Sequence, residues 1–324
     1  MHNLKIGFYV KWAISHTTNV IGDALLADSL CKALQNFPEV ASAKLYAPDI
    51  PFDERLDVLI YLNNVPRIES AARIHVHYMQ NGVDGEPASI LRQLLRYKYD
   101  AHVFFSKLFL ELFAKEGGNG LYLPFGVDTS FFCPHALQPE YEFDVSYVGN
   151  DIKGTERTMR YLYPAAAFNF GLFGNWRLPD INRRRPWKNI FFLRLPYYRW
   201  KFAKLSRGRI PQEAVPILYS SSKINLNCTL QACVDWDVVT LRAYEVLACR
   251  GFLLSDRVPA METELQGCLV TTDGYDDLRE KIAYYLAHDE ERISIASKGY
   301  DHVVKHATVQ ARAEQLLVFL KKFI

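Results

Sequence analysis

The chain has 324 residues, which is too long for one ordinary core and fits two domains. Apolar residues make up 49% and charged residues 23%, so disordered, fibrous and coiled-coil classes are excluded. Lys and Arg (38) nearly balance Asp and Glu (36), which gives no electrostatic sign of nucleic-acid binding. No apolar run approaches the ~20 residues that span a bilayer. With six scattered cysteines and no signal-peptide pattern, we expect a cytoplasmic protein with reduced thiols.

Short apolar strands alternate with helices along the first part of the chain. The expected strands span residues 5–10, 43–47, 56–62, 73–79 and 101–105, and the expected helices span 23–37, 88–98 and 106–115. Such alternation predicts a parallel sheet with helices on both faces.

A second alternation follows a linker at 139–143. Its expected strands span 144–149, 168–174, 223–227, 251–256 and 268–272, and its expected helices span 156–165, 211–220, 238–248, 275–287, 289–304 and 308–322. We therefore expect an α/β protein with two doubly wound, Rossmann-like halves. Ligands of such sheets bind at the carboxyl ends of the strands, so a cleft between the halves is the expected site.

Residues 176–209 differ in composition from the rest of the chain. They hold eleven Lys or Arg, eight aromatic residues and one acid, Asp180, which leaves 27 basic against 35 acidic residues elsewhere. Three interpretations stay open: contact with an anionic membrane surface, binding of a negatively charged acceptor, or a solvated hairpin. Membrane contact is favoured because aromatic and basic side chains both suit that interface.

The most informative motif is Arg242-Ala-Tyr-Glu245, which is followed by Gly251 and an apolar strand. Residues three apart share a helix face, and Gly251 marks the end of that helix. A carboxylate facing a cleft can accept both hydroxyls of a ribose, and an arginine beside it can hold a diphosphate. An ordinary surface ion pair is the alternative interpretation of this motif.

This stretch resembles the nucleotide-binding segment of group 1 glycosyltransferases, particularly the CgeB-like branch. Four further stretches resemble the family in the same order along the chain. They are Leu123–Pro134, Phe143–Asn150, Ile217–Asn227 and Tyr300–Leu317.

The resemblance implies a GT-B fold and a nucleoside diphosphate sugar as donor. It implies an acceptor-binding domain over 1–138 and a nucleotide-sugar-binding domain over 139–324, with the last helix packing back on the first domain. Glu245 would bind the ribose, Arg242 would contact the donor or orient Glu245, and Arg157 would neutralise phosphate charge. The full set of implied donor residues is Gly149, Asn150, Arg157, Asn227, Thr240, Leu241, Arg242 and Glu245.

Three residues are candidates for the chemical step. His16 and Asp23 flank the loop after the first strand, where acceptors bind in this fold, and either could act as base in an inverting reaction. Asp23 is also a candidate helix cap. Asp237 stands eight residues before Glu245, where the retaining members of the family usually carry a glutamate that contacts the sugar. The stereochemical outcome therefore stays open.

No metal or cofactor is expected apart from the donor substrate. Asp235-Trp-Asp237 matches the Asp-x-Asp metal motif of another glycosyltransferase architecture, but here it precedes a helix of a second domain. His75 and His77 share one face of a strand and lack a third ligand, so we interpret them as core residues.

Together these features predict a metal-independent hexosyltransferase acting on a cell-envelope glycan, a lipid-linked sugar or a protein, without a nucleic-acid partner. One rival hypothesis is a catalytically inactive relative that binds a sugar or a partner in a surface assembly. A second is a nucleotide-sugar epimerase, which would need an acid and base pair that the sequence does not reveal.

Overall fold

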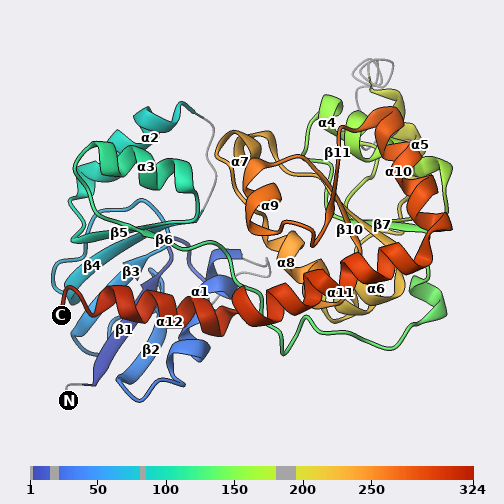
Figure 1. The fold of residues 1–324 in the computed structure, drawn as a ribbon. Helices are drawn as coiled ribbons and strands as arrows, with labels where there is room; N and C mark the ends of the chain where they lie inside the picture. The colour runs from blue at the N-terminus through green and yellow to red at the C-terminus, as the bar shows by residue number, and fades with distance from the viewer. Residues whose placement is uncertain (1–2, 15–21, 81–84, 180–194) are drawn as a thin grey trace, which may run out of the picture. The chain divides into compact units, whose positions relative to one another are not determined.

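The computed structural model describes residues 3–14, 22–80, 85–179 and 195–324. The chain divides into two compact units, each built on its own sheet (Figure 1). The first unit comprises Met1–Asp128, Asp235–Val239 and His306–Ile324, and the second comprises Thr129–Val234 and Thr240–Lys305. The division after Asp128 comes before the boundary at residue 138 that the sequence predicts, and the last helix belongs to the first unit.

A six-stranded parallel sheet forms the first unit, in the order β2-β1-β3-β4-β5-β6. Its strands are β1 (Leu4–Tyr9), β2 (Val40–Tyr46), β3 (Leu56–Tyr61), β4 (Ala72–Met79), β5 (Ala101–Phe104) and β6 (Leu121–Tyr122). Its helices are α1 (Gly22–Leu34), α2 (Pro87–Leu94), the 3₁₀ turn η1 (Leu95–Tyr97), α3 (Lys107–Lys115) and α12 (Val309–Leu320). Figure 1 shows α2 and α3 on one side of this sheet and α1 and α12 on the other.

The helices α2 and α12 each follow a residue whose side chain accepts hydrogen bonds from free backbone N–H groups of the first turn. Glu86 precedes α2 and accepts hydrogen bonds from the backbone nitrogens of Ala88 (3.0 Å) and Ser89 (2.7 Å). Thr308 precedes α12 and accepts one from Ala311 at 3.1 Å. α12 then buries Leu316, Leu317 and Leu320 on one face.

A five-stranded parallel sheet forms the second unit, in the order β11-β10-β9-β7-β8. Its strands are β7 (Val145–Val148), β8 (Phe170–Phe173), β9 (Ile224–Asn227), β10 (Leu253–Asp256) and β11 (Val270–Thr272). Its helices are α4 (Thr155–Tyr161), α5 (Tyr197–Leu205), α6 (Val215–Ser221), α7 (Gln231–Asp235), α8 (Leu241–Ala248), α9 (Pro259–Glu264), α10 (Tyr275–Ala287) and α11 (Asp289–His306). It also contains the 3₁₀ turns η2 (Pro139–Tyr141), η3 (Tyr163–Ala167) and η5 (Gln212–Ala214).

Both units have the doubly wound α/β order that the sequence predicts. In each, the chain steps to one side of its first strand and then returns to pair on the other side. The order therefore reverses at β1/β3 in the first unit and at β7/β9 in the second. These two points are where doubly wound sheets bind ligands.

Several helices of the second unit differ from the expectation. The helix predicted at 156–165 ends at Tyr161 and continues as the turn η3, because Pro164 has no N–H to extend it. The helix predicted at 238–248 begins only at Leu241, since Thr240 before it has extended backbone, with a φ of −72° and a ψ of 151°. The helices α5, α7 and α9 were not predicted. Within the described residues, no helix is both long and apolar enough to cross a bilayer.

Candidate functional site

Most of the predicted nucleotide residues gather at the β7/β9 reversal of the second unit. Gly149 directly follows β7, Asn227 is the last residue of β9, and Thr240 precedes α8. Arg242 and Glu245 lie in the first two turns of α8. The ends of β7 and β9 and the start of α8 therefore lie at one edge of the sheet. This edge carries Gly149, Asn227, Thr240, Arg242 and Glu245.

Arg242 is held against the ends of both strands. Its guanidinium donates to the Asn227 Oδ1 atom at 3.1 Å and to the Val148 carbonyl oxygen at 2.6 Å. The guanidinium also lies over the Tyr147 ring, 4.9 Å from its centroid. These contacts fix a positive charge at the point where the strand order reverses.

Glu245 lies one turn further along α8 and makes no ion pair with Arg242. Among the residues that the structure describes, none donates a hydrogen bond to its carboxylate. Burial raises the pKa of Glu245 to about 7, and the nearby charge of Arg242 only partly opposes this. A half-buried carboxylate with its acceptor positions unfilled is suited to a ligand that donates hydrogen bonds. Arg242 and Glu245 therefore do not form the surface ion pair that was the alternative interpretation of this motif.

Asn227 orients the neighbouring groups. Its Oδ1 accepts from Arg242 and, at 3.4 Å, from the Thr240 hydroxyl, while its Nδ2 donates to Ser255 Oγ at 3.0 Å and to Thr229 Oγ1 at 3.2 Å. The side chain is buried, so its contribution is to position Arg242. Leu241 begins α8 and is 38% exposed.

The turn at Gly149 and Asn150 packs closely on a second glycine turn. A Cβ atom on Gly174 would lie 2.1 Å from the Gly149 carbonyl oxygen, and one on Gly149 would lie 2.8 Å from the Tyr147 hydroxyl. The Asn150 Oδ1 atom accepts a hydrogen bond from the Asn175 nitrogen at 2.8 Å. Close packing therefore requires glycine at 149 and 174. Because glycine has no side chain, the backbone after β7 is not covered by one at position 149.

Lys153 is a candidate that sequence analysis missed. It lies in the loop between β7 and α4. Burial, and then the positive charge of Arg242, lower the pKa of its amine to about 8. In the described part of the chain, no hydrogen bond or ion pair holds this amine. The sequence signal was a lysine next to Gly154, whose φ of +83° lets the strand-to-helix turn bend sharply. Lys153 and Arg242 together favour an anionic ligand.

A family model described as "Glycosyl transferase-like" matches residues 157–318. The chain belongs to this family. No curated protein matches the chain.

Solved structures show which fold the chain has. HepE of Anabaena, solved with UDP and glucose, is 12% identical with a TM-score of 0.67, over 98% of this chain and 100% of that chain. Sucrose-phosphate synthase of Thermosynechococcus elongatus is 13% identical with a TM-score of 0.66, over 98% of each chain. BGT of T4 phage, in complex with UDP-glucose, is 16% identical with a TM-score of 0.57, over 98% of this chain and 99% of that chain. The fold of this glycosyltransferase family member is thus GT-B.

In this glycosyltransferase, the side chain of Arg157 binds other groups of the protein, which differs from the predicted phosphate contact. It forms a buried ion pair with Asp256 at the end of β10. It also donates to the Thr229 carbonyl oxygen at 2.7 Å and to the Gln231 side-chain oxygen at 2.9 Å. The Asp256 carboxylate also accepts from the Thr229 backbone nitrogen at 3.0 Å. Every guanidinium nitrogen of Arg157 is therefore already used within the protein.

The three predicted catalytic residues are His16, Asp23 and Asp237, and they lie in different parts of the chain. His16 lies outside the described residues. Asp23 lies within the first turn of α1 and accepts a hydrogen bond from Asn63 Nδ2 at 2.8 Å, next to the β1/β3 reversal. Asp237 belongs to the first unit and has a left-handed φ of +54°, which few side chains other than Asn and Asp adopt readily. Its neighbour Trp236 anchors it, because the Trp236 carbonyl oxygen accepts from Ser106 Oγ at 2.6 Å.

A cavity of about 210 Å³ lies at the carboxyl ends of β1, β3 and β4 in the first unit. Its polar lining consists of Lys11, Asn63, Asn64, His77, Gln80 and Gln93. The described residues that line it include no acid. Burial, with a smaller effect of His102, lowers the pKa of His77 to about 3, so its imidazole is neutral at physiological pH.

His75 and His77 are both buried, and His75 Nδ1 lies 2.9 Å from the Tyr61 hydroxyl. Within the described ranges, no three His, Cys, Asp or Glu side chains gather closely enough to hold a metal ion.

Proposed function

We propose that this chain transfers a sugar from a UDP-sugar to a hydroxyl-bearing acceptor. The observation that carries the proposal is the carboxylate of Glu245, which is half-buried beside the fixed charge of Arg242 and lacks a hydrogen-bond donor among the described residues. A ribose supplies two adjacent hydroxyl donors to such a group. HepE and BGT were solved with UDP or UDP-glucose, which supports uracil as the base of the donor.

The diphosphate of the donor would lie between Arg242 and Lys153. Two positive charges held at the β7/β9 reversal stabilise the negative charge that develops on the departing nucleotide. Gly149 itself has no side chain to keep the diphosphate away from the backbone after β7. Because side chains supply both charges, we propose that the reaction needs no divalent metal, and rates that stay unchanged in EDTA would support this.

The acceptor would bind in the cavity at the β1/β3 reversal of the first unit. Carboxamide side chains such as Asn64 and Gln93 both donate and accept hydrogen bonds, which suits a hydroxyl-rich acceptor. Lys11 would favour an acceptor that carries a negative charge. The acceptor would be a cell-envelope glycan, a lipid-linked sugar or a protein.

The base of an inverting reaction would be Asp23 or His16. Asp23 lies at the β1/β3 reversal, where its contact with Asn63 holds the carboxylate in place. In a retaining reaction neither is needed as a base, and Asp237 would contact the donor sugar. The anomeric configuration of the product, read by NMR, distinguishes the two.

We propose a hexosyltransferase of the CgeB-like branch that works at the cytoplasmic face of a membrane, because residues 176–209 are strongly basic and aromatic.

The test is a donor panel. Purified protein is incubated with UDP-, GDP-, ADP- and dTDP-sugars, and release of the nucleoside diphosphate is followed with and without glycan acceptors. The proposal predicts slow hydrolysis of one or more UDP-sugars and faster release with an acceptor. Neither turnover nor nucleotide binding with any donor would favour the catalytically inactive alternative.

A further inference from the structure

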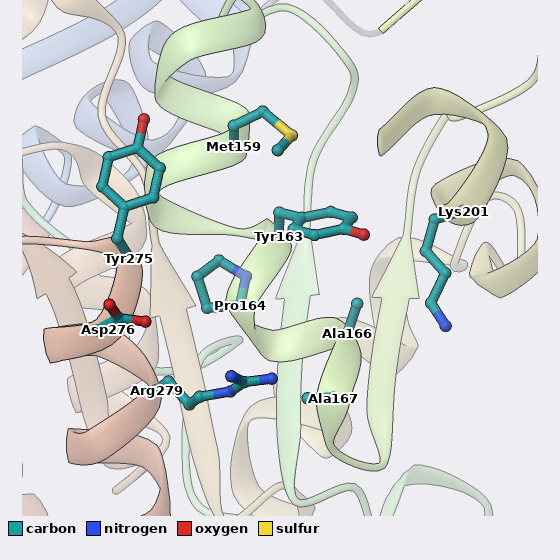
Figure 2. Close-up of a pocket in the computed structure, with 9 residues that line it drawn as sticks. All are labelled: Met159, Tyr163, Pro164, Ala166, Ala167, Lys201, Tyr275, Asp276 and Arg279. Atoms are coloured by element: carbon teal, nitrogen blue, oxygen red, sulfur yellow. The ribbon is translucent and has the colours of Figure 1, made fainter. Parts of the chain in front are cut away.

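A surface groove of the second unit shares no residue with the nucleotide site. Its volume is about 370 Å³, and its lining comes from α4, η3, α5 and α10. Figure 2 shows the Tyr163 ring in the middle of this groove, with Lys201 on one side and Tyr275 and Arg279 on the other.

The lining is largely apolar and aromatic. Met159, Pro164 and Ala166 line the groove with the Tyr163 ring (Figure 2). Tyr275 is 49% exposed and has a left-handed φ of +47°, an unusual conformation for a bulky side chain. Such a lining favours a ligand with hydrocarbon to bury.

Two cations complete the groove. Neither Lys201 nor Arg279 makes an ion pair or hydrogen bond within the described part of the chain. The acid in the lining is Asp276, so the groove carries an excess positive charge. The ligand should therefore combine an anionic group with apolar chains.

The helix α5 beside the groove carries further exposed aromatic and basic side chains. On α5, the side chain of Tyr197 is 70% exposed and that of Trp200 is 40% exposed. The Tyr197 ring meets the Tyr163 ring edge to face with centroids 6.2 Å apart, so the exposed aromatics continue directly from the groove. α5 also carries Lys204, which is exposed. Aromatic rings and basic side chains together are typical of surfaces that lie on anionic bilayers.

We propose that this groove and the adjoining exposed side of α5 bind anionic phospholipid at a membrane surface. Lys201 and Arg279 would contact the phosphate of a head group, and Tyr163 and Tyr275 would bury the start of its chains. A soluble phosphate would leave the exposed rings of α5 without a role. The proposal rests on the membrane contact in the proposed function and adds anionic phospholipid as its partner. It does not depend on any residue of the donor site.

The test is binding to vesicles of phosphatidylcholine alone or mixed with an equal part of phosphatidylglycerol. The full chain should sediment with the mixed vesicles and stay in solution with the neutral ones. The double variant Lys201→Glu/Arg279→Glu should bind the mixed vesicles at least about tenfold more weakly, because each basic residue near such a surface adds to binding. The variant Tyr197→Ser/Trp200→Ser should also bind more weakly.

The matched control is Lys298→Glu/Lys305→Glu, which changes two exposed lysines of α11 and shifts the net charge equally. Equal losses in both charge variants would overturn the proposal, since net charge alone would then explain binding. Full competition by glycerol 3-phosphate would also overturn it, because the ligand would then be a soluble anion. UDP titration of the same variants should be unchanged, and failure of UDP to bind the parent would count against the donor site alone.

Discussion

Arg242 and Glu245 lie three residues apart on α8, yet only the side chain of Arg242 makes hydrogen bonds within the described part of the chain. The guanidinium of Arg242 reaches the Asn227 side chain and the Val148 carbonyl, while the carboxylate of Glu245 receives no hydrogen bond from any described residue. Burial makes the charged form of Glu245 costly, as its raised pKa shows. A group kept in this state is typical of a binding site.

The first prediction concerns Lys153. Replacing it by Met should weaken UDP binding by about 1.5–3 kcal/mol, because a charged hydrogen bond to the diphosphate is lost. Uridine lacks phosphate, so its affinity should stay the same. Lys153→Arg should restore part of the UDP affinity. Calorimetric titration of both ligands checks this, and equal losses for UDP and uridine would place Lys153 away from the diphosphate.

The second prediction separates the structural role of Arg157 from a phosphate role. Arg157→Met leaves the buried Asp256 carboxylate without its ion-pair partner. The free energy of unfolding should fall by about 3–5 kcal/mol. UDP affinity of the folded variant should change little. Urea unfolding and UDP titration measure the two effects, and a stable variant that fails to bind UDP would reverse the assignment.

The third prediction follows from the raised pKa of Glu245. Its value of about 7 in the folded protein lies above the usual carboxyl value of 4.5. Between these values the folded state binds more protons than the unfolded state, so this group's contribution to stability falls as the pH rises from 4.5 to 7. Above pH 7 it changes no further. Glu245→Gln should remove this dependence and be more stable than the parent at pH 8.

Ligand binding should couple to the same proton. A ribose favours the ionised carboxylate, so UDP-glucose binding at pH 6 should release protons from the parent but not from Glu245→Gln. Titrations in buffers of different ionisation enthalpy measure this release. Equal proton release by both proteins would exclude Glu245 from the ribose contact.

The fourth prediction concerns Asp237. Asn adopts left-handed backbone as readily as Asp, so Asp237→Asn should preserve the fold and the melting temperature. If the carboxylate contacts the donor sugar, kcat should fall by about 100-fold or more. Asp235→Asn is the matched control and should keep its kcat. A fully active Asp237→Asn enzyme would remove Asp237 from the chemical step.

Sequence patterns predicted the two sheets well because parallel strands buried on both faces are short apolar runs. Val145–Val148 is such a strand, while Ile224–Asn227 alternates apolar residues with asparagine, and both were expected. The reversal of strand order between them depends on long-range pairing that local periodicity does not contain. The late start of α8 was missed because local periodicity did not reveal the extended backbone of Thr240, which precedes the helix.

The candidate site was predicted only in part. The spacing of Arg242 and Glu245 placed both on one helix, but it did not reveal that Arg242 turns toward the sheet. Arg157 and Lys153 show the limit most clearly: both are basic residues shortly after β7, and only their burial and partners distinguish them. Asp256, the partner of Arg157, lies 99 residues away along the chain.

The most direct test of the account is titration of the parent and Glu245→Ala with UDP, with Glu280→Ala as control. Glu280 is an exposed residue of α10, so its replacement should leave binding unchanged. We predict that Glu245→Ala binds UDP about 1.5–3 kcal/mol more weakly. If Glu245→Ala binds UDP as tightly as the parent, the ribose contact and the nucleotide site built on it are wrong.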